Sequence, residues 1–317
     1  MLGRKLAEAL ARDGGIGDRA VERLTLVDAF ATPAAPAGAT FTVETAVADI
    51  TAPGAAARLI AERPDVVFHL AAVVSGEAET DLEKGYLINL DGTRLLLDAI
   101  RLEGDEYVPR VVFSSSIAVF GGPYPEAIGD EFILQPLTSY GTQKAIGELL
   151  LSDYSRRGIL DGVGLRLPSI CVRPGAANKA ASGLFSNIIR EPLAGREVVL
   201  PASRDVRHWF ASPRSATGFL LHAAALDTAL LGDRRCLNMP GLSATIGEEI
   251  EALRRAAGDD AVALIREEPD ELIMRIVAGW PHSFDTARAH ALGFSAETSF
   301  DEIVRVHIED ELGGALG

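Results

Sequence analysis

Tyr140 and Lys144 lie four residues apart, a spacing that places two side chains one turn apart on the same face of a helix. An ammonium group beside a phenol favours the phenolate, and a phenolate can take the proton of an alcohol. With 5 tyrosines and 4 lysines in 317 residues, chance supplies only about 0.06 such pairs. The pair therefore indicates alcohol oxidation, and a surface Tyr–Lys contact on an amphipathic helix is the alternative.

The elements that must position this pair follow from the hydrophobic pattern of the first half of the chain. Predicted strands are Leu24–Val27, Phe41–Val43, Val66–Leu70, Val111–Ser114 and Val163–Leu167. Predicted helices are Leu2–Arg12, Ala55–Glu62, Lys84–Arg101 and Tyr140–Arg157. Strands that alternate with helices predict an α/β fold with a parallel sheet wound on both faces. Ligands of such folds bind beyond the carboxyl ends of the strands.

The strict alternation stops after Arg173–Gly175. Helices are expected at Gly183–Glu191, Ser212–Leu226, Thr245–Ala257, Glu268–Ala278 and Phe300–Leu312, joined by brief strands such as Val198–Leu200 and Cys236–Met239. We therefore predict a first domain over residues 1–172 and a smaller, mostly helical, substrate-binding part over residues 173–317. Some segments of the second part are expected to return to the first domain.

Charge and composition narrow the class of protein. The net charge of −15 argues against a nucleic acid or an anionic membrane as partner. No apolar run approaches the roughly 18 residues of a membrane helix, and the first residues show no signal core, so a cytoplasmic protein is expected. Cys171 and Cys236 stand alone and are expected to be buried, reduced thiols. The six histidines form no metal-binding motif, so no metal site is expected.

Seven motifs occur in an order typical of one known family. They are Leu26-Val27-Asp28, Asp49-Ile50, His69–Ala72, Asn89–Thr93, Ser114–Gly121, Tyr140-x-x-x-Lys144 and Arg173–Gly175. Together they resemble the extended short-chain dehydrogenase/reductase family, which includes NAD-dependent epimerases and dehydratases, over essentially the whole chain. The resemblance implies a Rossmann-type sheet that binds NAD.

Five further stretches resemble the family's dehydrogenases of small sugar acids such as D-erythronate. They are Ala72–Ala78, Thr138–Leu151, Ser182–Leu193, Val206–Trp209 and Asn238–Ser243. This resemblance implies a sugar acid as substrate and NAD as cofactor.

The amino end departs from the family pattern. The family opens with a strand and a G-x-x-G-x-x-G turn, whose helix N-terminal amides meet the pyrophosphate. Met1-Leu2-Gly3 matches only the last three positions, so the first strand and most of the Gly-rich turn are missing. Because that strand sits mid-sheet, its loss would strip hydrogen bonds from two neighbours. We expect the native polypeptide to begin about ten residues earlier, which the intact mass of the natural protein would test.

The resemblance implies three catalytic residues. Tyr140 takes the hydroxyl proton as a phenolate, while Lys144 holds the phenolate charge and bonds the nicotinamide ribose. Ser116 bonds the substrate oxygen and orients it toward Tyr140. Ser115 is the fallback for Ser116, because serine-rich strand ends also form turns.

The resemblance also implies an NAD site. Its residues are Gly3, Asp28, Asp49, Ile50, Leu70, Ala71, Ala72, Asn89, Ser115, Tyr140, Lys144 and Pro168. A carboxylate at Asp28 would accept from the adenine ribose and repel a 2′-phosphate, which favours NAD over NADP. A loop aspartate is the alternative for Asp28, a plain turn aspartate for Asp49, and helix–sheet packing for Leu70–Ala72. Asn89, a poor helix former, is expected to support the active-site backbone.

Substrate recognition requires a cation for the carboxylate, preferably a forked guanidinium. Arg207 is the first candidate, with Arg173 and Asn178 behind it. An ion pair with Asp205 or another acidic neighbour explains Arg207 equally well. Ser75 and Gly76, on the loop after Val66–Leu70, could meet substrate hydroxyls together with Ser116.

Three functions fit these residues. The first is NAD-dependent oxidation of a secondary hydroxyl of a small sugar acid to the oxo acid, with net production of NADH. The second is a nucleotide-sugar 4-epimerase or dehydratase with tightly bound NAD. The third is a non-catalytic nucleotide-sensing protein, which the missing glycine turn favours and the intact Ser116, Tyr140 and Lys144 disfavour. A homodimer paired through the Tyr–Lys helix is expected from the resemblance.

Overall fold

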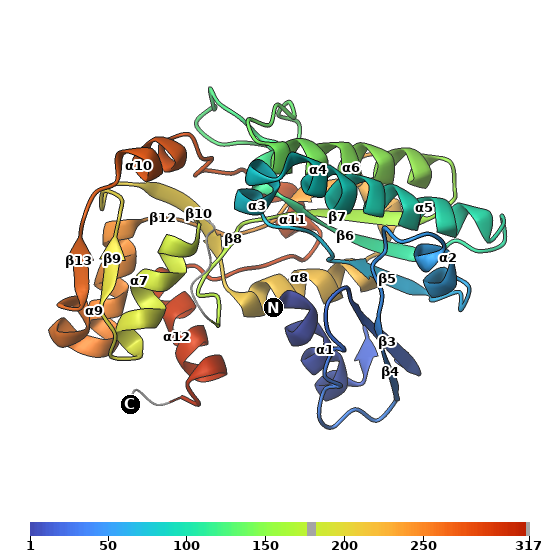
Figure 1. Cartoon of the computed structure of the whole chain (residues 1–317), viewed down its shortest axis with the longest axis horizontal. Coiled ribbons are helices and arrows are strands. Elements are labelled where there is room, and N and C mark those ends of the chain that lie inside the picture. The colour runs from blue at the N-terminus through green and yellow to red at the C-terminus, as the bar shows by residue number, and fades with distance from the viewer. Residues whose placement is uncertain (176–181, 315–317) are drawn as a thin grey trace. The chain divides into compact units, whose positions relative to one another are not determined.

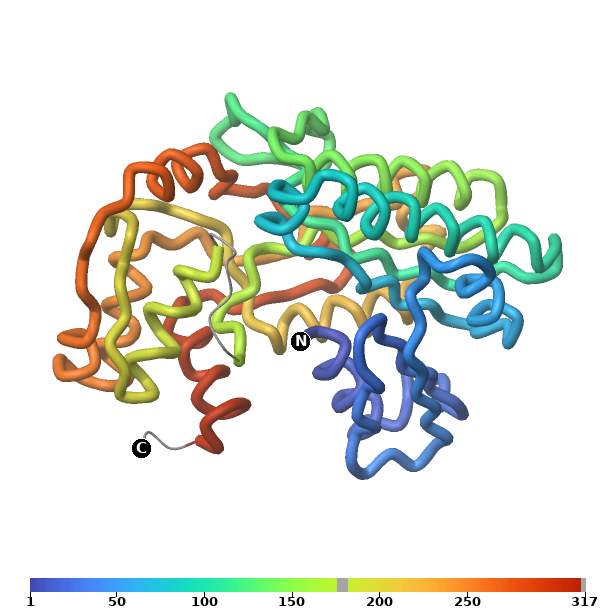
Figure 2. Tube along the Cα trace, viewed as in Figure 1, coloured from blue at the N-terminus to red at the C-terminus, as the bar shows by residue number. Residues whose placement is uncertain are grey.

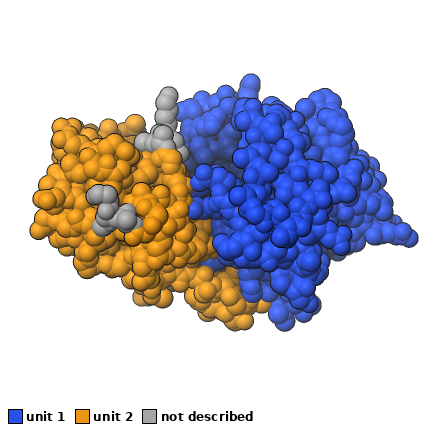
Figure 3. Space-filling model, turned by 90° about the horizontal axis from the view of Figure 1, so that it is seen from below, with its two compact units in different colours: residues 1–119, 136–166, 217–237 blue, residues 120–135, 167–216, 238–317 orange. Residues whose placement is uncertain are grey.

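The computed structural model describes residues 1–175 and 182–314, which fold into two compact units (Figures 1 and 2). The first unit comprises residues 1–119, 136–166 and 217–237, coloured blue in Figure 3. The second comprises residues 120–135, 167–216 and 238–317, coloured orange. Neither unit is continuous in sequence, whereas the predicted division has one main boundary after residue 172.

A four-stranded sheet forms the centre of the first unit. Its order is β11-β7-β6-β5, formed by β11 (Cys236–Asn238), β7 (Asp161–Leu167), β6 (Arg110–Ser116) and β5 (Val66–His69). β5 and β6 pair in parallel. Val112, Phe113, Val163 and Leu165 are almost completely buried, because helices cover both faces of the sheet. Figure 1 shows α5 (Gly92–Leu102) and α6 (Ser139–Arg156) on one side and α8 (Pro213–Ala225) on the other. The predicted α/β architecture is confirmed.

A second, two-stranded sheet in this unit stands apart from the first. β3 (Arg23–Asp28) and β4 (Thr42–Val47) pair in parallel along their full length. Among the described strands, none pairs with the other edge of β3 or of β5. The apolar side chains of Val27 and Val47 are exposed. The other edges of β3 and β5 are therefore unpaired among the described strands, and folded proteins usually cover or blunt such edges.

The helices of the first unit follow the sequence pattern, with two differences. α1 (Leu2–Asp13) and α2 (Ala55–Ile60) lie where helices are predicted. The predicted helix Lys84–Arg101 is instead a run of α4 (Leu82–Gly85), the π-helix η1 (Tyr86–Asp91) and α5. Ser75 and Gly76 were expected on a loop, but they begin α3 (Ser75–Thr80). The cause is Val74, whose carbonyl accepts the amides of Glu77 and Ala78 and starts a helix directly after the strand end.

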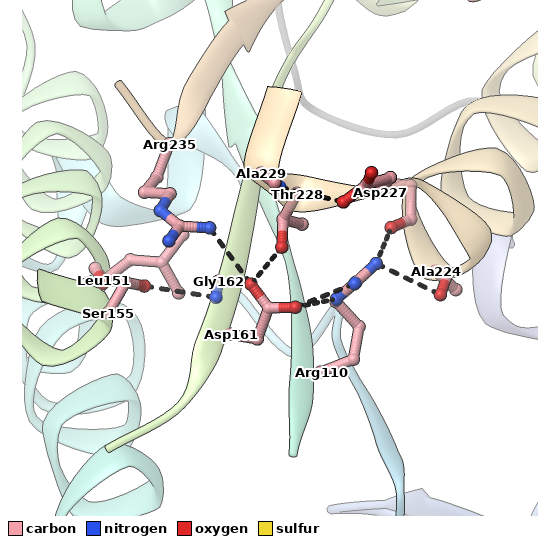
Figure 4. A network of polar contacts seen from close by, with 11 residues as sticks. Arg110, Leu151, Ser155, Asp161, Gly162, Ala224, Asp227, Thr228, Ala229 and Arg235 are labelled. Carbon is pink, nitrogen blue, oxygen red and sulfur yellow. Dashed lines mark hydrogen bonds and ion pairs between the residues drawn. The ribbon is translucent and has the colours of Figure 1, made fainter. Parts of the chain in front are cut away.

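Short elements complete the first unit. β1 (Gly15–Ile16) and β2 (Arg19–Ala20) form a hairpin, and η2 (Ile117–Val119) directly follows β6. The 3-10 helix η3 (Thr228–Leu231) and the end of α8 are bonded to the amino ends of β6 and β7 through Arg110 and Asp161 (Figure 4).

The second unit packs helices around two small sheets. β12 (Leu242–Thr245), β10 (Arg207–Ala211) and β8 (Ser169–Ile170) form one, and β13 (Ile265–Glu267) with β9 (Val198–Leu200) forms the other. Its helices are α7 (Gly183–Leu193), α9 (Ile246–Val262), α10 (Glu271–Ala278), α11 (Ala287–Ala291) and α12 (Phe300–Glu311). The five predicted helix regions overlap α7 to α10 and α12, although α7 and α9 extend beyond the predicted ends, and β10 and β12 were not predicted. Cys171 and Cys236 are free and buried, as expected.

Asp161 holds together the amino ends of β6 and β7. Its carboxylate accepts from Arg110 Nη2 at 2.7 Å, Arg235 Nη1 at 3.0 Å and Thr228 Oγ1 at 2.7 Å (Figure 4). Arg110 Nη1 also donates to the carbonyl of Ala223, 2.8 Å away near the end of α8. The network therefore joins β6, β7, the end of α8 and η3. It lies at the amino ends of the strands, away from their carboxyl ends.

Asp161→Ala is expected to lower the free energy of unfolding by about 2–4 kcal/mol, because two partly buried guanidinium groups lose their counter-ion. Urea denaturation would measure the change. Asp153→Ala is the control, because it makes the same substitution at an aspartate that forms an exposed pair with Arg156. It should change the free energy of unfolding by less than about 1 kcal/mol. Equal losses in the two variants would contradict the role given to Asp161.

Among residues 1–175 and 182–314, no helix is both long and apolar enough to span a membrane.

Candidate functional site

The carboxyl end of β6 and the first turns of α6 bring the predicted catalytic residues into one unit. Thr138 caps α6, since its side-chain oxygen accepts the amide of Gly141 at 3.1 Å. Gly141 permits a close approach: a Cβ built there would lie 2.1 Å from the carbonyl oxygen of Ala118, just beyond Ser116. A larger residue at 141 would therefore push α6 away from the strand end that carries Ser116.

Lys144 is a buried cation beneath the first turns of α6. Its side chain is among the most buried of the chain, with 2% of the residue exposed. Nζ donates to the carbonyl of Ser114 at 2.8 Å and lies 4.8 Å from the centre of the Phe113 ring. The centre of the Tyr140 ring is 5.8 Å from the same Nζ. The predicted proximity of an ammonium group and the Tyr140 ring is therefore present.

Burial sets the charges around Lys144. It lowers the pKa of Lys144 to about 8, although the negative charge of Glu148 acts in the opposite direction. Burial also lowers the pKa of His69 to about 3, and the charge of Lys144 adds to this effect. His69 is thus neutral at physiological pH, whereas Lys144 is largely protonated below pH 8.

The three serines at the end of β6 point to different partners. Ser116 is half-buried, and its hydroxyl oxygen accepts the amide of Ala118 at 3.1 Å. Ser115 is 2% exposed, and its hydroxyl donates to Glu148 Oε1 at 2.5 Å. Ser114 donates to the carbonyl of His69 at 3.0 Å. The geometry therefore favours Ser116 over Ser115 as the hydroxyl available to a substrate.

Asn89 lies in the π-helix and bonds the chain that follows β5. Its Oδ1 accepts the amide of Val73 at 2.8 Å, and its Nδ2 donates to the Val73 carbonyl at 3.2 Å. Nδ2 also donates to Gln143 Oε1, 2.7 Å away on α6 between Tyr140 and Lys144. Asn89 therefore supports backbone beside the site, which is the geometry expected for it.

The residues predicted to bind NAD lie in the first unit, apart from Pro168. Gly3, in the first turn of α1, is next to Leu70, since an added Cβ would lie 3.9 Å from Leu70 Cδ1. Ala71 and Ala72 follow and are exposed. Small, accessible residues beside the amides of a helix N-terminus suit the close approach of a dinucleotide.

The two predicted aspartates bond their own loops. Asp28, at the end of β3, accepts the amide of Phe30 at 2.8 Å. Asp49 accepts the amide and hydroxyl of Thr51 at 2.9 and 2.7 Å, which is the turn geometry of the simpler interpretation. Ile50 packs toward Gly92 of α5, where an added Cβ would lie 3.0 Å from its Cδ1. Contacts to a cofactor remain predictions for all three.

The predicted substrate cations lie in the second unit. Arg207 is exposed, donates to the Ser243 carbonyl at 3.1 Å and pairs with Glu248 at 3.3 Å. The acidic-neighbour alternative for Arg207 thus describes its contacts, with Glu248 rather than Asp205 as partner. Arg173 donates through Nη2 to the carbonyl and hydroxyl of Ser182, both at 2.8 Å.

Asn178 and Pro168 are the remaining predicted ligand residues. Asn178 lies outside the described residues. Pro168 is buried at the end of β7, in the second unit.

Sequence reasoning missed Glu148, Arg166 and Gln143, all of them buried close to the site. For Glu148 the sequence did contain a signal. It is a charged residue four positions after Lys144, so both lie on the helix face that should pack against the sheet. In the described part of the chain, no group of three or more His, Cys, Asp or Glu could hold a metal ion.

The sequence is similar to a known protein family and to characterised enzymes. Residues 1–228 match the profile of the NAD dependent epimerase/dehydratase family. A D-erythronate dehydrogenase of Cupriavidus necator is 45% identical over 314 residues, covering 98% of this chain and 95% of the relative. A D-erythronate dehydrogenase of Haemophilus influenzae is 42% identical over 254 residues, 80% of each chain.

Solved structures show the same fold. The crystal structure of the nucleoside-diphosphate-sugar epimerase from Agrobacterium tumefaciens is 62% identical and superposes with a TM-score of 0.97, covering 100% of this chain and 93% of that one. A GalE-like L-threonine dehydrogenase from Cupriavidus necator, in its holo form, is 24% identical with a TM-score of 0.82, covering 96% of this chain and 94% of that one. At this identity, the second likeness concerns the fold alone.

Proposed function

Because this chain belongs to the NAD-dependent epimerase/dehydratase family, we propose that it oxidises a secondary hydroxyl of a small sugar acid, with D-erythronate as the first candidate. Its relatives identify it as an NAD-dependent dehydrogenase. The observation that carries the proposal is the buried Lys144 cation, 5.8 Å from the centre of the Tyr140 ring and close to the strand end that bears Ser116.

The chemistry follows from these three side chains. NAD, when bound, supplies the acceptor for the hydride of the carbinol carbon. Tyr140 takes the hydroxyl proton, and Lys144 stabilises the negative charge that would otherwise be costly in a buried site. Ser116 donates a hydrogen bond to the substrate oxygen and holds it toward Tyr140. The residues that would hold the cofactor are Gly3, Asp28, Leu70–Ala72 and Lys144.

The test is a screen of four- to six-carbon sugar acids with NAD, read as NADH absorbance. Net NADH from D-erythronate or a similar acid supports the proposal, and no net NADH from any acid of the series contradicts it. A nucleotide-sugar epimerase is the second candidate, because the similar Agrobacterium protein is a nucleoside-diphosphate-sugar epimerase. Conversion of a UDP-sugar without net NADH would establish that alternative.

Arg207→Ala is expected to raise the KM for sugar acids about tenfold and to leave the KM for neutral polyols nearly unchanged, because only the acids offer a carboxylate. Steady-state kinetics with both substrate classes would measure this. Arg204→Ala is the control, since Arg204 is also an exposed arginine of the second unit and pairs with Glu267. Equal effects of Arg207→Ala on acids and polyols would refute carboxylate recognition.

A further strand in the first unit is also proposed. We propose that a parallel strand, connected to α1 through a glycine turn, lies between β3 and β5. The support is the pair of open edges on these strands and the exposure of Val27.

Adding such a strand and turn before residue 1 should raise the melting temperature and tighten NAD binding, since two strand edges gain partners and the pyrophosphate gains amides. Calorimetry and fluorescence titration with NAD would compare the two proteins. An extended protein with unchanged melting temperature and affinity would contradict the added strand.

We propose that the expected homodimer pairs through α6, the Tyr–Lys helix, together with its neighbour α5. Leu95 and Leu102 of α5 and Leu149 of α6 are exposed, and Tyr154 of α6 bonds Asp98 of α5 at 2.8 Å, which holds the two helices together. Apolar side chains on paired, rigid helices suit an interface with a second copy.

Leu149→Glu is expected to weaken dimerisation on the order of 100-fold, because each copy would bury an unpaired carboxylate. Light scattering over a range of concentrations would measure the mass. Leu230→Glu serves as control, because Leu230 is as exposed as Leu149 but lies in η3. A wild-type protein that stays monomeric at every concentration would rule out the proposed pairing.

A further inference from the structure

A buried ion pair lies one helical turn beyond Lys144. Arg166 of β7 contacts the Glu148 carboxylate of α6 through Nε at 3.0 and 3.1 Å and through Nη2 at 2.8 Å. Both side chains are almost fully buried. Such a pair adds little net stability, because the desolvation of two charges offsets their attraction. Stability alone is therefore a weak reason for its presence beside the site.

Glu148 also fixes the end of β6. It accepts the Ser115 hydroxyl at 2.5 Å, and Ser115 directly precedes Ser116. Successive side chains of a strand point to opposite faces, so the bond on Ser115 holds the backbone from which Ser116 projects on the other side. Gly147, the residue before Glu148, lets the helix approach this strand, since an added Cβ would lie 2.7 Å from the Phe113 ring.

Glu148 also acts on Lys144 through its charge, which raises the pKa of the lysine. The titratable and charged groups around Lys144 are Tyr140 and Glu148 on α6, His69 on β5, and Arg166 on β7 beyond Glu148. His69 is neutral, as burial lowers its pKa to about 3. Of these described groups, Glu148 is the carboxylate, and its charge raises the pKa of Lys144 against the effect of burial.

We propose that Glu148 is a positioning residue with two separable effects: through Ser115 it fixes the location of Ser116, and through its charge it keeps Lys144 protonated. Arg166 is the counter-ion of the buried Glu148 carboxylate. Glu148 needs no contact with substrate or cofactor for either effect. The inference rests on the proposed Ser116–Tyr140–Lys144 chemistry and extends it to the layer behind these residues.

The test uses the small number of lysines. The chain has 4, so their Cε resonances in a protein labelled with 13C-lysine are resolvable, and Lys144→Met assigns the one of interest. The titration midpoint of Lys144 in Glu148→Gln should move to lower pH by roughly one unit. The alkaline limb of the kcat–pH profile should move in the same direction, which a purely structural role would not produce.

Two further variants separate the two effects. Ser115→Ala removes the hydrogen bond between β6 and Glu148 but keeps the Glu148 carboxylate. The kcat should therefore fall about tenfold, while the titration midpoint of Lys144 stays in place. Asp153→Asn is the control on the same helix, because Asp153 is an exposed acid paired with Arg156, and both readouts should match the wild type. A Lys144 midpoint that moves in Ser115→Ala as far as in Glu148→Gln would overturn the assignment of charge to Glu148.

Glu148→Gln leaves the Arg166 guanidinium without its carboxylate and could fail to fold. Glu148→Gln/Arg166→Gln removes both charges and keeps two amides that can bond each other, so it provides a folded protein for the same titration. Because loss of the Arg166 cation by itself raises the Lys144 midpoint, Arg166→Gln is titrated alongside. A double variant whose Lys144 midpoint is no lower than that of Arg166→Gln would overturn the proposal. If the wild type oxidised no sugar acid, the proposed function would fail, whereas the Lys144 midpoints would still decide the role of Glu148.

Discussion

Tyr140→Phe is expected to lower kcat at least about 10³-fold, while the melting temperature and the affinity for NAD stay near those of the wild type. The change deletes one oxygen atom and keeps the ring. Tyr140 is half-buried, so the ring can hold its place without the hydroxyl. What is lost is the base that takes the substrate proton. Because proton and hydride leave the same alcohol, the loss should appear in kcat rather than in binding.

Steady-state kinetics with the best sugar acid, together with calorimetry and NAD titration, would measure these three quantities. Tyr154→Phe is the matched control, since it deletes the hydroxyl of another tyrosine on α6 that bonds Asp98 rather than the site. Its kcat should stay within about twofold of the wild type. A Tyr140→Phe protein with wild-type turnover would rule out the mechanism proposed for this site.

Lys144→Met is expected to lower kcat by about 10²-fold or more and, at the same time, to stabilise the fold. Activity falls because no cation remains to balance the tyrosinate charge. Stability rises because burial lowers the pKa of Lys144 from 10.5 to about 8, which means that the native state holds a charge it disfavours. A difference of this size corresponds to about 3 kcal/mol.

The sign of the pH dependence follows from the same values. Between pH 10.5 and about 8, the unfolded chain binds a proton that the native state resists, so falling pH lowers the stability of the wild type. Below about pH 8 the native lysine is also protonated and the cost is constant. The net gain in Lys144→Met should therefore be about 1–3 kcal/mol at pH 7, after loss of the bond to Ser114, and should vanish near pH 10.5.

Urea denaturation at pH 7 and pH 10 would measure this gain, and the same preparations would give kcat. A variant that is both inactive and less stable at pH 7 would show that Lys144 serves the fold. Such a result would contradict the view that the protein tolerates a buried charge for catalysis. Lys84→Met is the control, because Lys84 forms an exposed pair with Glu77 and should change neither quantity strongly.

The amino-acid sequence already determined much of the first unit. The spacing of Tyr140 and Lys144, the alternation of strands with helices and the position of Ser116 all depend on local pattern. Local pattern was enough because a parallel sheet needs apolar strands and covering helices. Apolar residues are spaced differently along these two kinds of element, so the sequence distinguishes them. The expected first strand came from the family pattern rather than from local periodicity, and it stays a prediction.

Only the tertiary structure decided which polar side chains face each other. The choice between Ser115 and Ser116 depends on Glu148, which is 33 positions away from Ser115 in the sequence. The pairing of Glu148 with Arg166 joins a helix to a later strand, and the pair between Arg207 and Glu248 joins a strand to a later helix region. A sequence gives the identity of such groups, but their partners are set when distant segments pack and exclude water. Burial then fixes the charge of Lys144 and His69, which no local pattern contains.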